Sequence, residues 1–522
     1  MFKQPYYKKK SLTNNTHHQI LHMHSNFYST INLFLLFISP SLTAQTFSSK
    51  IIDGKTKKAI PYATVEYGEN QGVITNEEGS FSFTLGSNLA SLDSVYISSM
   101  GYKRTGFALE QLKDSILFVT PKAIELSGVY LFDKELEADE IIEKMIERLP
   151  DNVNNTPIKQ RFFLRQSVFG TIQKLDFGFE KSSIEELDEA FVDSLGKAIP
   201  KNSYHYTETL GDLYTSDSKN KIAILKAAEL YNKKDVTSFE DFSKKMKIIF
   251  EKNIKPDSYL KIKSGIFSEK VQVDSIMADF EAEEAAAIEK EIENDTVSNL
   301  IDNQKFIFDE LLQEVYHQED TKLNVVDKYR KYEFQLAGYS EIENQGVYII
   351  NFQPKGGADF RGRFFINIED FAVMRVDFEN LKNLRNFRLL GIFYRETIYK
   401  GSMQFTKLKN GRYDLKFVDF NFGRWFRIDR PLDIIEKNKN VKGRRKQNEL
   451  KLNIDFRMTN TNKWELVIFE NNLIEPSQFD VYKEDKTKKA TYMGKYNPEF
   501  WKGYNIMEPN EAIRKFTVEE SE

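Results

Sequence analysis

The alternation of apolar and polar residues between Lys328 and Phe469 constrains the fold most strongly. Because successive side chains of a β-strand point to opposite faces, this period of two predicts strands with one apolar and one polar face. Turn sequences such as Glu343-Asn-Gln-Gly346 separate the runs, as in β-hairpins. We therefore expect an antiparallel meander over residues 328–522 that forms a half-barrel or a small barrel. The clearest runs are Tyr413, Leu415 and Phe417, and then Leu450, Leu452, Ile454, Phe456 and Met458.

A second β-rich pattern precedes it, from Phe47 to Val129. Short β-branched and aromatic runs, such as Ile60-Pro-Tyr-Ala-Thr-Val-Glu66, are interrupted at close intervals by Gly, Pro and Asn. This spacing predicts a small antiparallel β-sandwich. The segment resembles the carboxypeptidase-regulatory-like module at the front of many cell-envelope proteins of Bacteroidetes-type bacteria. The resemblance implies a place in the envelope and an architecture, and it implies no peptidase chemistry.

The resemblance continues at residues 346–355 and 361–374, which are similar to the second half of a larger Bacteroidetes family. In that family the module is followed by a large β-rich region of unassigned function. In outline, that region is similar to the open barrels that carry lipoproteins or lipids.

Helical periodicity occupies the middle of the chain. One helix is expected from Ala138 to Leu149, stopped by Pro150, and others from Ser238, from Ser275 to Glu293 and from Leu300 to Tyr316. The later helices are expected to form an insertion or cap over a sheet. The predicted organisation is an N-terminal extension with an export signal, the β-sandwich, a linking helix and linker, a mixed strand and helix region, and the β-rich domain with its aromatic tail: residues 1–44, 45–130, 131–157, 158–327 and 328–522.

The N-terminus has the pattern of an export signal. The apolar run Ile31–Ile38 is too short to span a bilayer, and it is followed by Pro40 and the small-residue end at Ala44. Cleavage near Ala44 is expected, with Met1 or Met23 as the start. The mature protein is then predicted to be periplasmic or associated with the outer membrane.

Composition narrows the partners. The chain has no cysteine, which excludes disulfides, thiolate metal sites, cysteine nucleophiles and a lipidated N-terminal cysteine. The net charge of −4 does not suggest nucleic acid as a partner. An envelope protein, a glycan or a lipid is expected instead. The basic stretch Lys437–Lys446 could contact anionic headgroups, and we interpret it as a solvated hairpin loop.

The sharpest candidate for chemistry is a zinc site. His205-Tyr-Thr-Glu208 and His317 follow an order and separation similar to those of metallocarboxypeptidases, in which two His and a Glu hold zinc. The surroundings fit poorly, because the glycine-rich, strand-ending context of that family is missing and the module lies on the other side. We therefore predict no catalytic residue, no metal and no cofactor.

The predicted function is a non-enzymatic binding or scaffolding protein of the cell envelope. The alternatives are a zinc metallocarboxypeptidase, an integral outer-membrane β-barrel, and a half-barrel that binds lipid or lipoprotein. The apolar face of the sheet distinguishes two of these readings. A filled core favours scaffolding, and an open apolar cavity enclosed by the sheet favours lipid or lipoprotein binding.

Overall fold

The computed structural model describes residues 45–68, 72–85, 93–122, 136–216, 219–278, 299–438, 440–443 and 445–518. The export signal, most of the helix predicted from Ser275 to Glu293, and Lys439 and Arg444 of the basic stretch lie outside the described residues. The chain divides into a small unit, residues 1–46 and 84–91, and a large unit, residues 47–83 and 92–522. All described residues belong to the large unit except 45–46 and 84–85, which are the ends of two strands. It is mainly β with large antiparallel sheets, which confirms the predicted fold class.

The N-terminal module consists of two small sheets. Their strand orders are β4-β1-β7 and β3-β2-β5-β6. The second sheet is antiparallel, as expected, whereas β1 and β7 pair in parallel. The strands are β1 (Gln45–Asp53), β2 (Thr64–Glu66), β3 (Gly72–Ile74), β4 (Ser80–Leu85), β5 (Ser94–Ser98), β6 (Thr105–Ala108) and β7 (Lys113–Val119), with the 3-10 turn η2 (Leu109–Leu112) before β7.

The meander is the centre of a much larger sheet. Its strands are β13 (Tyr332–Ile342), β14 (Gln345–Pro354), β15 (Phe360–Asn367), β16 (Val373–Asn380), β17 (Asn386–Leu389), β18 (Ile392–Lys407), β19 (Tyr413–Asn438) and β20 (Lys446–Leu473). The β13–β14 turn has positive φ at both Glu343 and Asn344, the backbone of a tight hairpin. The basic stretch lies between β19 and β20, which pair as a hairpin.

The sheet also includes strands from the mixed region. Strand β20 pairs with β8 (Ile158–Ser182) along the whole of β8, and β9 (Asn202–Ser216) and β10 (Lys219–Tyr231) follow. Residues 158–231 and 332–473 therefore share one sheet. In the described part of the chain its two ends, β13 and β21 (Thr491–Tyr492), do not pair, so the sheet is open and the small closed barrel is wrong. The hairpin β11 (Ser258–Ser264) and β12 (Phe267–Gln272) extends β19 at its far end.

The helices differ from expectation mainly at their ends. Helix α2 (Ala138–Asn152) continues through Pro150, since proline in the last turn removes only one hydrogen bond and Val153 N–H closes the helix on Leu149. Helix α4 (Lys233–Asn253) begins before Ser238, where the Asn232 side chain caps it, and α6 (Leu300–Gln313) ends before Tyr316. The remaining helical elements are α3 (Glu189–Ala198), residues 273–278, η3 (Tyr329–Lys331), α7 (Pro476–Val481), η4 (Pro498–Trp501) and α8 (Glu511–Arg514). None of the helices in the described ranges is long and apolar enough to cross a membrane.

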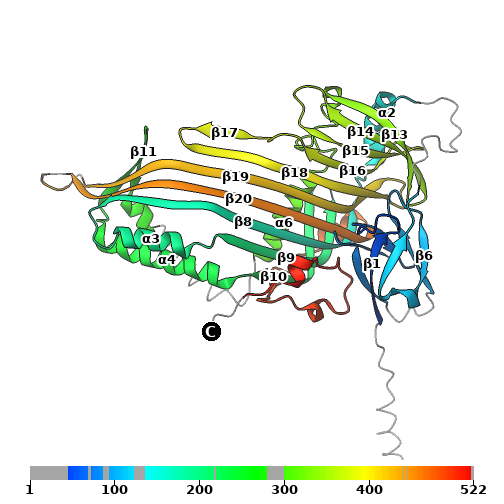
Figure 1. Ribbon diagram of the computed structural model, residues 1–522, viewed down its shortest axis with the longest axis horizontal. Helices are drawn as coiled ribbons and strands as arrows, with labels where there is room; N and C mark the ends of the chain where they lie inside the picture. The colour runs from blue at the N-terminus through cyan, green and yellow to red at the C-terminus, as the bar shows by residue number, and fades with distance from the viewer. Residues whose placement is uncertain are drawn as a thin grey trace, which may run out of the picture. The chain divides into compact units, whose positions relative to one another are not determined.

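We call the part of the large sheet around Phe162, Phe163 and Phe417 its near part, and the part beside α4 and the β11–β12 hairpin its far part. The near part is covered on both faces. We call the face toward α2 and α6 the inner face, where Phe308 of α6 packs edge-on against Phe162 of β8, 4.7 Å between ring centres. On the outer face, Trp501 of the tail packs against Phe163 at 5.7 Å, and Tyr62 of the module packs against Phe417 at 4.8 Å. Figure 1 shows β18, β19, β20 and β8 running on side by side from this region to the part where α3 and α4 lie against them.

A β-bulge corrects one sequence-based prediction. Tyr413, Leu415 and Phe417 were expected on one face, but the pairing of β18 with β19 shifts register between Gln404 and Phe405. Tyr413 and Leu415 therefore join the inner core, and Phe417 joins the outer one. The extra residue of a bulge reverses the side-chain alternation, and no pattern of apolar residues reveals it.

Candidate functional site

The inner face of the sheet has three zones. In the near zone, α2 and α6 cover a dense core that includes Phe162, Phe308 and Phe420. In the far zone, α4 and the β11–β12 hairpin bury a small cluster around Ile249 and Leu260, with Ile434 and Leu450 of the sheet against it. The middle zone belongs to neither cluster. A filled core therefore occupies part of the inner face and does not extend over the middle of the long strands.

The register identifies which side chains face inward in the middle zone. Phe426 and Ile428 follow core residue Phe420 at even spacing, and the β19–β20 pairing has no shift between them. Their neighbours on β17, β18, β20 and β8 are also apolar. We call this set the apolar band: Ile172, Leu175, Phe177, Phe387, Leu389, Ile392, Tyr394, Phe426, Ile428, Ile454, Phe456 and Met458.

The apolar band is not buried. Phe387 is 45% exposed and Leu389 is 46% exposed, and each of the other ten side chains is partly exposed. Folded proteins rarely leave such a contiguous apolar face uncovered unless it binds something. The run from Ile454 to Met458 was predicted correctly as one apolar face. The alternation of residues alone did not determine whether this face would be covered.

Arginines lie at both ends of the apolar band. Arg424 is exposed at the end nearer α6. Arg430, at the other end, is 7% exposed, donates from Nε to Ser264 Oγ at 2.7 Å, and lies over the Phe267 ring at 4.8 Å. Within the described residues, no carboxylate forms an ion pair with Arg430, and its Nη1 has no hydrogen-bond partner. A buried cation without a counter-ion is costly, so this end of the band favours an anion.

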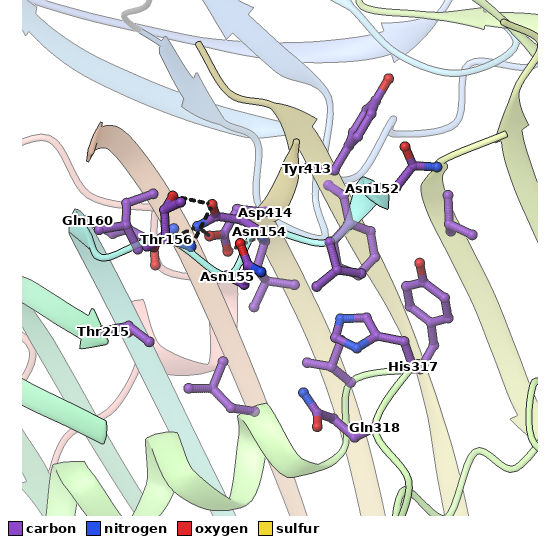
Figure 2. A pocket seen from close by; sticks show the side chains of 18 of the residues that line it. Asn152, Asn154, Asn155, Thr156, Gln160, Thr215, His317, Gln318, Tyr413 and Asp414 are labelled. Atoms are coloured by element: carbon purple, nitrogen blue, oxygen red, sulfur yellow. Dashed lines mark hydrogen bonds between the residues drawn. The ribbon is translucent and has the colours of Figure 1, made fainter. Parts of the chain in front are cut away.

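A separate cavity of about 650 Å³ lies at the near end of the inner face. Six segments meet around it: the chain from Asn152 to Gln160, the ends of β9 and β10, residues 309–318 at the end of α6, the start of β16, and the bulged part of β18 and of β19. In Figure 2, His317 and Gln318 approach the cavity from one side, and Asn154 and Asp414 approach it from the other.

Asp414 is fixed at the wall of this cavity. Its carboxylate accepts a hydrogen bond from Asn154 Nδ2 at 2.8 Å and from its neighbour Leu415 N–H at 2.7 Å. Burial raises the pKa of Asp414 despite these hydrogen bonds. Burial also lowers the pKa of His317 to about 4, so its imidazole is neutral at pH 7. No pattern pointed to Asp414, which the sequence places at a polar position of an ordinary strand.

The three zinc candidates do not come together. His205 is exposed on β9, where its ring stacks on Tyr231 at 5.0 Å. Glu208 lies three residues on, hence on the opposite face, and its carboxylate accepts from Arg165 Nε and from Trp501 Nε1, both at 2.8 Å. His317 belongs to the cavity beside α6. The described residues contain no group of three side chains placed to hold a metal ion.

Glu208 instead belongs to a buried ionic cluster that sequence reasoning missed. Arg165 is 1% exposed and donates to Glu208 and to the backbone carbonyl of Met507 at 2.8 Å. Nearby, Lys463 bridges Glu465 at 3.0 Å and Glu77 of the module at 2.7 Å. These contacts attach the tail and the module to the outer face of the sheet. Only the unusual position of an arginine within the apolar run of β8 could have indicated a buried charge.

Comparison with known proteins identifies no family. No family model and no curated protein matches the chain. Among solved structures, a putative outer membrane lipoprotein-sorting protein domain from Vibrio parahaemolyticus is 8% identical, covers 66% of this chain and 97% of its own, and has a TM-score of 0.19. A LolA superfamily protein from Nitrosomonas europaea is 8% identical, covers 67% and 99%, and has a TM-score of 0.16. The MucA/MucB complex of Pseudomonas aeruginosa is 6% identical, covers 62% and 93%, and has a TM-score of 0.18. Likenesses this low establish neither a common fold nor a common function.

Proposed function

We propose that the protein is a non-enzymatic binding protein of the bacterial cell envelope that holds an acyl chain of a lipid on its apolar band. The observation that carries the proposal is the apolar band, a contiguous apolar face on which every side chain is partly or largely exposed. The export pattern before Gln45 and the resemblance of residues 47–129 to an envelope module support the location. The open sheet favours this reading over pure scaffolding, because a scaffold needs no unfilled apolar face.

The dimensions of the apolar band suit an acyl chain. The band crosses five neighbouring strands, from β17 to β8. With strands about 4.8 Å apart, it is about 19 Å wide. One leaflet of a bilayer, the length of one acyl chain, is about 15 Å thick. Arg430 and Arg424 at the two ends can neutralise an anionic headgroup, and no acidic side chain belongs to the band itself.

A dansyl-labelled fatty acid tests the proposal. Saturable binding to the purified protein, with the fluorescence increase of an apolar environment, is expected. Phe426→Ser removes a central ring of the apolar band and should weaken binding about tenfold, since burial of one such side chain contributes roughly 1.5–3 kcal/mol.

The matched control is Phe393→Ser, which removes a partly exposed ring from the outer face of β18. This change should leave the affinity unchanged. The proposal fails if the probe does not bind saturably, or if the two variants weaken binding equally. Binding of a helical peptide in place of the fatty acid would indicate a protein partner and would also overturn it.

A further inference from the structure

The cavity beside α6 differs in chemistry from the apolar band. Its lining contains amides, hydroxyls, two aspartates and one histidine, but neither lysine nor arginine. The histidine is neutral at pH 7, because burial lowers the pKa of His317 to about 4. The cavity therefore offers no cation to a phosphate or carboxylate, whose binding depends on positive side chains. An anionic ligand does not fit this site.

The cavity has two kinds of wall. Tyr316, Phe405 and Leu415 form an apolar wall, in which the two rings meet edge-on with centres 5.2 Å apart. Asn154, Asp414 and Gln318 belong to the polar wall. A purely apolar ligand would shield the Gln318 amide from water without giving it a hydrogen bond, which costs free energy. A ligand that combines an apolar face with neutral donors and acceptors avoids this cost.

Part of the polar wall is rigid before any ligand arrives. Asn154 donates to Asp414 at 2.8 Å, and its Oδ1 accepts from Thr156 Oγ1 at 2.7 Å and from Asn410 at 3.1 Å. Gln318, on the other side, forms no side-chain hydrogen bond with another residue in the described ranges, and its amide lies toward the cavity (Figure 2). The Asp414 carboxyl group, held in place by Asn154, and the Gln318 amide opposite it form a polar site that is partly preorganised.

From these walls we infer that the cavity binds a neutral saccharide. A sugar ring presents C–H groups on its faces and hydroxyls around its edge, which matches an aromatic wall opposite amides and a carboxyl group. About 650 Å³ lies within the range of small-molecule sites and admits one or two sugar rings. This site is distinct from the apolar band and does not depend on the proposed lipid.

Titration calorimetry of the full protein with the neutral disaccharide of N-acetylglucosamine tests the inference. Saturable binding is expected, and Gln318→Ala should weaken it about tenfold through the loss of one or two hydrogen bonds. The matched control, Gln353→Ala, changes an exposed glutamine of β14 and should have no effect. Asp414→Asn, checked for an unchanged melting temperature, should weaken binding as well.

Two further measurements test whether the cavity prefers a neutral sugar and whether it is separate from the apolar band. N-Acetylglucosamine phosphate should bind at least tenfold more weakly than the neutral sugar, and the sugar should leave the affinity for the dansyl-labelled fatty acid unchanged. The inference is overturned if the disaccharide does not bind, if the phosphorylated sugar binds equally well, or if Gln318→Ala and Gln353→Ala behave alike. Displacement of the fatty acid by the sugar would place the sugar on the apolar band and would equally refute a separate cavity site.

Discussion

His317 illustrates how burial sets the chemistry of a single residue. Its ring stands edge-on to Tyr316 at the wall of the cavity, 5.0 Å between ring centres. Burial penalises the charged imidazolium and lowers the pKa of His317 from 6.5 to about 4. A histidine that follows an amphipathic helix at the surface would have kept its ordinary pKa.

The shifted pKa of His317 predicts a pH dependence of stability. Between pH 6.5 and pH 4 the unfolded chain binds a proton that the folded chain does not, so the free energy of unfolding falls as the pH is lowered through this window. His317→Gln should remove this part of the dependence, which melting temperatures of both proteins across the window will show. Parallel curves for the two proteins would contradict the burial of a neutral His317.

Arg165 and Glu208 show the limit of motif reading at the residue scale. The spacing His205-x-x-Glu208 matches a zinc motif, yet an odd separation on a strand places the two side chains on opposite faces. The separation of His205 from Glu208 therefore follows from the sequence once β9 is recognised as a strand. The sequence does not reveal that buried Arg165 of β8 is the partner of Glu208, because that pairing depends on which strands become neighbours.

Helix α6 provides the clearest comparison among the elements. Phe308 is fully buried against Phe162, whereas Phe306, two residues earlier on the same helix, is 62% exposed. The helical period separates them by more than half a turn. Helix α6 thus covers the near zone of the inner face with one stripe of apolar residues.

This contrast yields a matched pair of variants. Phe308→Ala should lower the free energy of unfolding by about 3–5 kcal/mol, since it leaves a cavity in the core. Phe306→Ala should change it by less than about 0.5 kcal/mol. Chemical denaturation monitored by circular dichroism measures both changes. Similar losses for the two variants would mean that α6 does not cover the sheet as described.

At the scale of the whole molecule, the C-terminal tail completes the core of the outer face. Trp501, Met507 and Ile513 are buried against the sheet, and Trp501 also donates to Glu208. Removing the tail would uncover Phe163 and leave Arg165 and Glu208 without several of their partners. The tail is therefore part of the fold of the sheet.

Deletion of residues 497–518 tests this role. The loss of stability should exceed the roughly 3–5 kcal/mol of a single buried aromatic residue, and the variant should bind an apolar dye such as ANS. The control is the double variant Lys502→Ala/Lys515→Ala, which should leave the melting temperature unchanged. Both lysine side chains are 74% exposed. An intact melting transition without the tail would contradict its part in the core.

The sequence alone determined the mainly β class, the turns of the meander and the inward set of side chains on β20, because alternation and turn chemistry act between residues close in the chain. Tertiary structure decided the rest. It joined β8 to β20, covered both faces of the near zone, left the apolar band partly exposed and assembled the cavity from six segments that are distant in the sequence. Alternation specifies that a face is apolar, but only long-range packing decides whether another element covers it. For this reason the sequence left scaffolding and lipid binding as alternatives, and the partly exposed apolar band in the middle of the long strands favours the second.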